Sequence, residues 1–561
     1  MEKEVQNLTH RLELVKRESR HSSPTTENRR TVEGEHGILL VDQGSTKYIN
    51  HEVLVNSGAQ LDTTLRGSNI RETDMGLLAG SSESTIDIKK SRPQRGDGED
   101  DSVTQSVDAK PRRNIPTTGN EFLFQYSSMV ISLSSFHPSR VHHRVLWNLY
   151  EENVAPLVMI AHRPSLRQLM SSVAVTAVAV DRASEALIFA VYFAAITSLN
   201  PTQCTEIFGQ DHSALQQHYR FATQQALARA NFLQSQSLTV LQATTLFLTC
   251  LRGAGDAAFV WAMTAAIRRI AQGLGLHRDG TCLGLSPFET EVRRRMWWAI
   301  YLLDCQSSEI RAIGTQQTNE HISDTKLPLN INNSDISPES AAAPQERSSF
   351  TDMAFCLIRC EMTALCRQLR SDRHSSSPHV VKSLHALKQI HSRLRKRYLD
   401  FCDVRIPLQW VTATVIRLAL ARSWLIAHLP DGMPTEEQVS LMGSSAADGL
   451  KREQLFVTAI EVLEFAYLLE TDPRTKQWSW LFQGYPQWHA AIFVLQQICT
   501  GPQSRLTDRA WAVVSKAVSC WRNTDFHKDE IPSILVSRLV VRAAVVQGCI
   551  WGGGEREDRR G

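Results

Sequence analysis

Hydrophobic residues recur every three or four positions from about residue 121 to residue 551, the spacing of amphipathic helices. Residues 181–198 are nearly all apolar, as in a buried helix. At 286–311 a helix is predicted to begin with Ser-Pro-Phe-Glu, because Ser caps, Pro fits the first turn and Glu suits the positive dipole end. Further helices are predicted at 211–233, 236–251, 256–275, 349–371, 379–400, 406–428, 450–470, 480–500, 505–521 and 532–551. Strand-like alternation is scarce, so the sequence predicts an all-α fold, a large multi-helix domain over 121–551.

The first residues carry a short apolar stripe. Val5, Leu8, Leu12 and Val15 are spaced by three, four and three residues, which places them on one side of a helix as in a heptad repeat. This spacing predicts a short coiled-coil-like helix over residues 1–20. Two heptads stabilise a helix only weakly, so a solvated tail is the alternative.

Residues 21–120 have a different composition, rich in Ser, Thr, Gly, Asn, Asp and Arg, with few aromatic residues. Such a segment buries too little apolar surface to offset its conformational entropy, which predicts a disordered linker. Within it, the basic cluster Lys89–Arg95 could act as a nuclear import signal, but acidic residues follow it closely and favour a solvated linker. Residues 552–561 are predicted to be a disordered tail.

The overall composition is that of a soluble protein, with 42% hydrophobic and 21% charged residues in 561. A net charge of only +3 gives no general basic field, so nucleic-acid binding would require a local patch. The 11 cysteines contain no Cys-x-x-Cys pair, and with no signal segment they indicate thiols in a reducing compartment. The apolar stretches Ala186–Ile196 and Leu238–Leu251 are too short or too interrupted to span a membrane, so none is expected.

No known catalytic motif is present: the sequence lacks His-Glu-x-x-His, a phosphate-binding loop and Gly-x-Ser-x-Gly. The glycines of 273–280 do not have dinucleotide-loop spacing and fit the end of a helix instead. Cys356, Cys360 and Cys366 could suggest a metal site, but zinc needs about four ligands, and buried thiols on an apolar helix are favoured. We therefore predict no catalytic, cofactor-binding or metal-binding residues, and a protein that is not an enzyme.

The densest pattern lies at 271–311. Glu291 is one helical turn before Arg295, so these two side chains are predicted to pair. The run Arg293–Arg295 could contact phosphate, but the adjacent Trp297 and Trp298 favour a helix packed into the core.

The same residues carry a family resemblance. Ala-Gln-Gly-Leu-Gly-Leu-His-Arg-Asp at 271–279, then Ser-Pro-Phe-Glu-x-Glu-x-Arg-Arg-Arg-x-Trp-Trp at 286–298, resembles the middle homology region of fungal zinc-cluster transcription factors. The resemblance extends over roughly 140–520, with its signature core at 140–340. The residues to which it gives a structural role are Gly275, His277, Arg278, Glu291, Arg294, Trp297, Trp298, Asp304, Gly314 and Pro328.

This resemblance implies an all-helical regulatory domain of a nuclear transcription regulator that controls a metabolic pathway or secondary-metabolite gene cluster. Family members carry a six-cysteine, two-zinc module that binds DNA, then a linker and a dimerising coil. Here the first cysteine is Cys204, well inside the helical body, whereas the Val5–Val15 stripe resembles the coil. A truncated reading of the gene, an isoform and a natural loss are all compatible with this arrangement.

The resemblance also implies the partners. We expect DNA contact only through an absent or partner module, zinc only if a six-cysteine module precedes the chain, and a homodimer or a partner transcription factor. A small-molecule effector is compatible with such a body. The alternative is a scaffold or ligand-binding protein that shares the fold without acting on genes.

Overall fold

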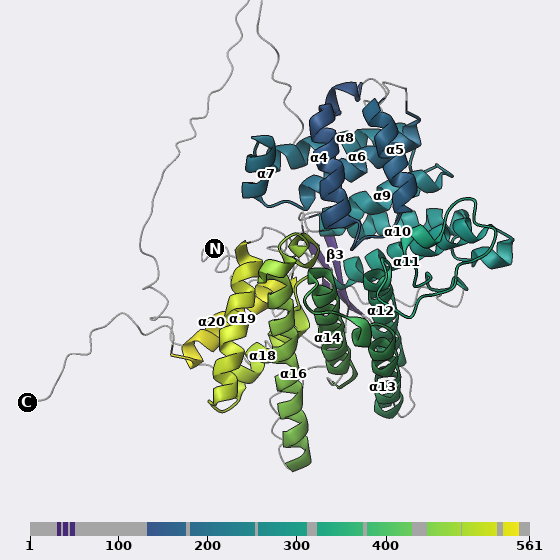
Figure 1. Cartoon of the computed structure of the whole chain (residues 1–561). Coiled ribbons are helices and arrows are strands. Elements are labelled where there is room, and N and C mark those ends of the chain that lie inside the picture. Colours follow the sequence, from purple (N-terminus) through teal and green to yellow (C-terminus); the bar gives the residue numbers. More distant parts are fainter. Residues whose placement is uncertain are drawn as a thin grey trace, which may run out of the picture.

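The computed structural model describes residues 31–34, 37–42, 45–50, 132–175, 180–252, 256–310, 323–373, 379–428, 446–483, 485–523 and 531–548. From residue 132 onward it is a body of helices, with the earliest and the latest helices at different ends (Figure 1). The first part comprises α4 (Arg140–Leu149), α5 (Arg163–Val175), α6 (Arg182–Thr197), α7 (Pro201–Phe208), α8 (His212–Arg229), α9 (Leu238–Leu251), α10 (Ala257–Gly273) and α11 (Pro287–Ile310). The second part comprises α12 (Ala354–Arg373), α13 (His379–Arg397), α14 (Pro407–His428), α16 (Ala446–Thr471), α17 (Ser479–Gln483), α18 (Trp488–Thr500), α19 (Arg505–Asn523) and α20 (Ile531–Val546). The all-α fold predicted for this body is confirmed.

Local capping chemistry fixes the helix ends around the signature. The hydroxyl of Ser286 accepts a hydrogen bond from the backbone N–H of Glu289, whose carboxylate accepts from the N–H of Ser286. At the end of α10, Gly275 adopts a left-handed backbone with φ of 76°, and the N–H of Leu276 bonds back to the carbonyl of Ala271. The predicted helix start and glycine stop are therefore both present.

One predicted helix is divided in two. The sequence pattern predicts a single helix over 480–500, whereas the structure has α17 ending at Gln483 and α18 beginning at Trp488. Pro486 lies between them and lacks a backbone N–H, so it cannot continue the hydrogen bonding of a helix.

Three short strands differ from the prediction for the N-terminal part of the chain. Strands β1 (Thr31–Gly34), β2 (Gly37–Asp42) and β3 (Ser45–Asn50) pair antiparallel in the order β1-β2-β3. They lie in the segment 21–120, for which composition predicts a linker without secondary structure. The runs Gly-Ile-Leu-Leu-Val-Asp and Ser-Thr-Lys-Tyr-Ile-Asn are rich in β-forming residues and are separated by two positions, a hairpin signal that the composition of the whole segment conceals.

Other N-terminal and C-terminal predictions fall outside the described residues. These are the helix over 1–20, with Val5, Leu8, Leu12 and Val15, the basic cluster Lys89–Arg95, and the tail over 552–561.

The N-terminal core is built around α6. Every residue from Ala186 to Ile196 is buried, because α8, α9 and α4 pack around this helix. Aromatic side chains fill the contact between α6 and its neighbours, with Phe193 against Phe247 of α9 and Tyr192 against Tyr219 of α8. A helix that is apolar on all sides is thus buried on all sides, as its sequence predicts.

The C-terminal helices form a second core and return to the first. In this second core α16, α18, α19 and α20 pack together around residues such as Leu463 and Val494. The indoles of Trp478, just before α17, and of Trp480, within α17, donate hydrogen bonds to the carbonyls of Glu152 and Asn153, in the π-helical turn Tyr150–Val154. The segment that leads into α18 is therefore bonded to the beginning of the body.

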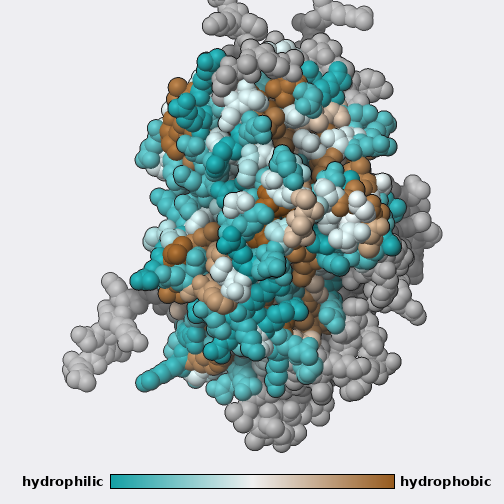
Figure 2. Space-filling model, turned by 45° about the vertical axis from the view of Figure 1, so that its right-hand side comes forward, coloured by the Kyte–Doolittle hydropathy of each residue, from teal (hydrophilic) through white to brown (hydrophobic). Residues whose placement is uncertain are grey.

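One described helix, α14, is long and apolar enough to cross a membrane, and α6 with α7 meets the same test only as a pair bent by 117°. Helix α14 packs between α12, α13 and α16, and its residues Val411 and Leu425 contribute to the first and second core respectively. On the face shown in Figure 2, hydrophilic residues cover much of the surface and hydrophobic ones form separate patches. These contacts identify α14 as a core helix that joins the two cores.

The contact between α16 and α19 predicts a pH-dependent stability. The carboxylate of Glu470 accepts a hydrogen bond from Nε1 of Trp521 at 3.3 Å, and burial raises the pKa of this carboxyl to about 7. Between the unfolded pKa, about 4.3, and pH 7 the folded state holds a proton that the unfolded state has released, so stability falls as pH rises through this window. Glu470→Gln should be more stable than the wild type at pH 8 by about 1–3 kcal/mol, and this advantage should vanish toward pH 4.

Thermal unfolding at several pH values measures this difference. Glu464→Gln is the matched control on the same helix, because Glu464 forms a solvent-accessible ion pair with Arg509. A gain for Glu470→Gln that is the same at every pH would contradict the assignment.

Candidate functional site

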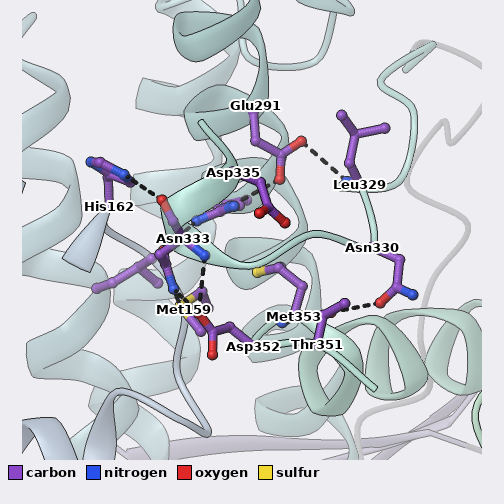
Figure 3. Close-up of polar contacts among 12 residues, drawn as sticks. Met159, His162, Glu291, Leu329, Asn330, Asn333, Asp335, Thr351, Asp352 and Met353 are labelled. Atoms are coloured by element: carbon purple, nitrogen blue, oxygen red, sulfur yellow. Dashed lines mark hydrogen bonds and ion pairs between the residues drawn. The ribbon is translucent and has the colours of Figure 1, made fainter. Parts of the chain in front are cut away.

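The signature residues converge where α10 turns into α11. The segment between these helices folds back on α11, and residues 323–353 pass along the other side of α11 with no regular structure except a short 3-10 turn, Asn333–Asp335. Charged side chains of α11 point into this interface, where the loop supplies their hydrogen-bond partners (Figure 3). The arrangement brings together residues 162, 279, 291–298 and 324–352.

A buried ion pair closes the corner formed by the turn between α10 and α11, residues 274–286. Nε and Nη2 of Arg294 donate to the two carboxylate oxygens of Asp279, both at 2.8 Å, and the side chains are only 8% and 1% exposed. Asp279 also accepts from the backbone N–H groups of Thr281 and Lys326. The Arg294 guanidinium, helped by these donors, holds the pKa of Asp279 well below its usual range. Asp279 is thus a permanently ionised structural anchor.

A second buried pair joins α11 to the loop. Nε of Arg295 donates to Glu291 at 2.9 Å, as the spacing predicts, and Nη1 donates to Oδ1 of Asn333 at 3.0 Å. The other oxygen of Glu291 accepts the N–H of Leu329 at 3.1 Å. Burial raises the pKa of Glu291, and the Arg295 charge opposes this effect. The carbonyl of Asn333 accepts from Nε2 of His162 at 3.0 Å, which extends the network to the segment before α5 (Figure 3).

The remaining signature residues support the same corner. Arg278 forms an exposed ion pair with Asp324 at 3.1 Å, and the carbonyl of His277 accepts the N–H of Asp324. Nε1 of Trp298, which is partly exposed, donates to the carbonyl of Lys326 at 2.9 Å. Gly275 ends α10, and Trp297 and Pro328 are buried. Asp304 pairs with Arg268 at 3.0 Å. Gly314 lies outside the described residues.

The arginines of 293–295 and two cysteines of α12 bond within the fold. Arg293 donates to the carbonyl of Leu274 at 2.8 Å, so all three guanidinium groups of 293–295 are engaged within the fold and the phosphate-contact interpretation has no support. The thiol of Cys356 donates to the carbonyl of Leu157, and that of Cys366 lies 3.1 Å from the hydroxyl of Ser423. The described part of the chain contains no group of three or more side chains placed to hold a metal ion.

A cavity of about 130 Å³ lies elsewhere in the body, and the sequence did not reveal it. It is partly open and is lined by the end of α9, by α11, α12 and α14, and by residues of α16, α17 and the segment after α17. Its charged lining residues are Arg252, Glu309, Arg359, Arg367 and Arg422. These residues come from helices far apart in the chain and share no motif, so no local pattern could have identified them.

Comparison with known proteins identifies the class. Residues 147–421 match the fungal specific transcription factor domain. The chain is 30% identical over 411 residues to the aurofusarin cluster transcription factor aurR2 of Gibberella zeae, an alignment that covers 72% of this chain and 60% of that protein. It is also 30% identical over 435 residues to the transcriptional regulator AacuB of Aspergillus aculeatus, covering 76% and 58% respectively.

The chain belongs to the family that carries this fungal specific transcription factor domain, which confirms the resemblance found in residues 271–298. A further relative, the C6 finger domain transcription factor nscR of Aspergillus fumigatus, is 30% identical over 384 residues, 66% of this chain and 48% of that protein. The chain thus spans about half to three fifths of the length of these relatives.

The Asp279–Arg294 pair predicts a large effect on stability. Asp279→Ala leaves the buried Arg294 guanidinium without its counter-charge, which should lower the free energy of unfolding by about 3–5 kcal/mol. The matched control is Asp403→Ala, which breaks the exposed Asp403–Arg405 pair and should leave the melting temperature unchanged. Denaturant unfolding of both variants tests this, and equal stabilities would show that the buried pair does not anchor the corner.

The two tryptophans should differ in their contribution. Trp297 is 6% exposed in the main core, so Trp297→Ala should cost about 3–5 kcal/mol. Trp298 is partly exposed, so Trp298→Ala should cost less. Melting curves of the two variants measure which substitution lowers the melting temperature more. If Trp298→Ala lowers it as much as Trp297→Ala or more, the packing described here is contradicted.

Proposed function

We propose that this chain is the regulatory body of a nuclear transcription regulator that controls a secondary-metabolite gene cluster and has no enzymatic activity. The family domain over 147–421 carries this proposal. Two relatives support the cluster role by their names, the aurofusarin cluster transcription factor and the pyriculol/pyriculariol biosynthesis cluster transcription factor. The geometry agrees with a regulatory rather than a catalytic role, since the signature side chains hold helices and loop together.

DNA contact, in this proposal, belongs to a zinc-cluster module on a partner or attached to this body, and zinc belongs to that module. Two observations support this division. Cys204, the first cysteine, is buried in α7 and is not part of a six-cysteine cluster. The arginines of 293–295, the densest basic run on α11, are bonded within the fold.

The chain alone should therefore show only weak, sequence-independent DNA binding that is lost as salt rises, because few phosphates would be neutralised. A random-site selection at near-physiological salt tests this. Fusion of a six-cysteine module ahead of Met1 is the matched comparison and should recover a defined motif, since such modules place a helix in the major groove. A defined motif recovered with the unfused chain would overturn the division.

Chromatin occupancy of the tagged protein in its own cell tests the regulatory role itself. Enrichment at a group of neighbouring biosynthetic genes supports the proposal. Nuclear exclusion or uniform background would instead favour a scaffold or ligand-binding protein that shares the fold.

We further propose that the stripe of Val5, Leu8, Leu12 and Val15 mediates a weak homodimer or pairing with a partner transcription factor. Leu8→Lys combined with Leu12→Lys places two charges in the seam and should lower the dimer fraction in sedimentation at micromolar concentration. Glu4→Lys with Lys16→Glu, outside the stripe, is the control and should leave the dimer fraction unchanged. A wild type that is monomeric under these conditions contradicts the seam.

A further inference from the structure

The cavity of about 130 Å³ has a mixed lining, apolar on several sides and strongly basic on the others. Its apolar wall includes Ile358 and Met362 of α12 and Val415 and Leu418 of α14. Four arginines and one carboxylate, Glu309, make up the charged lining among the described residues. Such a lining suits a ligand with an apolar body and a negative charge.

Arg252 is the most deeply buried of the four lining arginines. It follows α9 directly and is 3% exposed. Its Nη1 donates to Oε1 of Gln306 and its Nη2 to the carbonyl of Leu481 at 3.0 Å, whereas its Nε has no hydrogen-bond partner within the described structure. Burial, together with the charge of Arg359, lowers the pKa of Arg252 to about 9. A buried guanidinium with an unused donor carries a desolvation cost, and a negative charge placed close to it would offset part of that cost.

The neighbouring charges do not neutralise Arg252. Arg359, partly buried on α12, donates to the carbonyl of Leu157 at 3.3 Å, and in the described ranges no carboxylate forms an ion pair with either Arg252 or Arg359. The one acidic residue of the lining, Glu309, is paired with Arg422 at 2.8 Å, and Arg422 also donates to the hydroxyl of Tyr485. Arg252 and Arg359 are therefore two lining arginines without a carboxylate partner among the described residues.

We propose that this cavity binds a small carboxylate with an apolar body about the size of benzoate, and that this molecule is the effector of the regulatory body. A carboxylate matches the planar donor face of arginine. The volume is similar to that of an engineered cavity of about 150 Å³ that holds benzene. The apolar lining disfavours a fully hydrated anion such as inorganic phosphate, since that ion would lose its water without gaining apolar contacts.

The position of the cavity provides a route to regulation. It lies where α9 and α11 of the first part meet α12, α14 and α17 of the second. A bound carboxylate would join Arg252, at the end of α9, to side chains of α12 and α14, and so favour one relative arrangement of these helices. This regulatory role rests on the proposed function, whereas the binding itself does not.

Thermal unfolding of the full chain with three probes tests the binding. Benzoate should raise the melting temperature in a saturable manner. Benzamide, the neutral isostere, and inorganic phosphate should not. Arg252→Met removes the donor and should weaken benzoate binding by at least about tenfold, measured by calorimetry. Ala419→Leu fills the cavity, retains all four arginines and should also abolish the response.

Arg293→Met is the matched control, because its guanidinium bonds to Leu274 away from the cavity, and it should retain the benzoate response. If Arg252→Met fails to fold, Ala419→Leu decides the outcome. The proposal is overturned if benzoate has no effect, if benzamide or phosphate acts as well as benzoate, or if a folded cavity variant still responds. The benzoate experiments contain no DNA, so their outcome does not depend on the chromatin experiment. If the protein occupies chromatin but does not bind benzoate, the effector proposal is rejected and the proposed function is retained.

Discussion

The burial of charge on α11 is the constraint on which the corner of the fold depends. Glu291, Arg294 and Arg295 are almost completely removed from water, and each would cost several kcal/mol if left unpaired. Their partners come from the turn before α11 and from the loop after it. The path of the loop is therefore constrained, because a path that removed these partners would leave a buried charge unpaired. A segment with little regular structure acquires a unique conformation in this way.

The same network explains why the family signature contains both charged and aromatic residues. Trp297 packs into the core while Trp298 bonds to the loop, so one helix is fixed by apolar contact and by hydrogen bonds together. Through Asn333 the network reaches His162, and the indoles beside α17 reach Glu152 and Asn153 in the same N-terminal region. The signature thus records the architecture of the body, and the chemistry available to a ligand lies elsewhere.

The sequence predicts a structural feature well when the residues that determine it are close together in the chain, and poorly when they are far apart. The end of α10, the start of α11 and the pairing of Glu291 with Arg295 follow from residues within one or two turns, so they were predictable. The Asp279–Arg294 pair needed the tertiary turn between two helices. The three strands were missed because composition was averaged over a long segment. The sequence did not predict the cavity, because each of its arginines has the local sequence context of an exposed charge on a helix and only the tertiary fold brings them together.

Arg294 and Arg252 illustrate two outcomes of the same physical situation. Both are buried guanidinium groups, but two oxygens of Asp279 satisfy the first, whereas the second bonds only to a side-chain amide and a carbonyl and retains an unused Nε. If stability alone governed the sequence, an apolar residue at position 252 would pack against the same neighbours without the desolvation cost of a charge. A lysine could not supply a planar set of donors there. In the proposed complex, the carboxylate of the ligand supplies to Arg252 the negative charge that Asp279 supplies to Arg294.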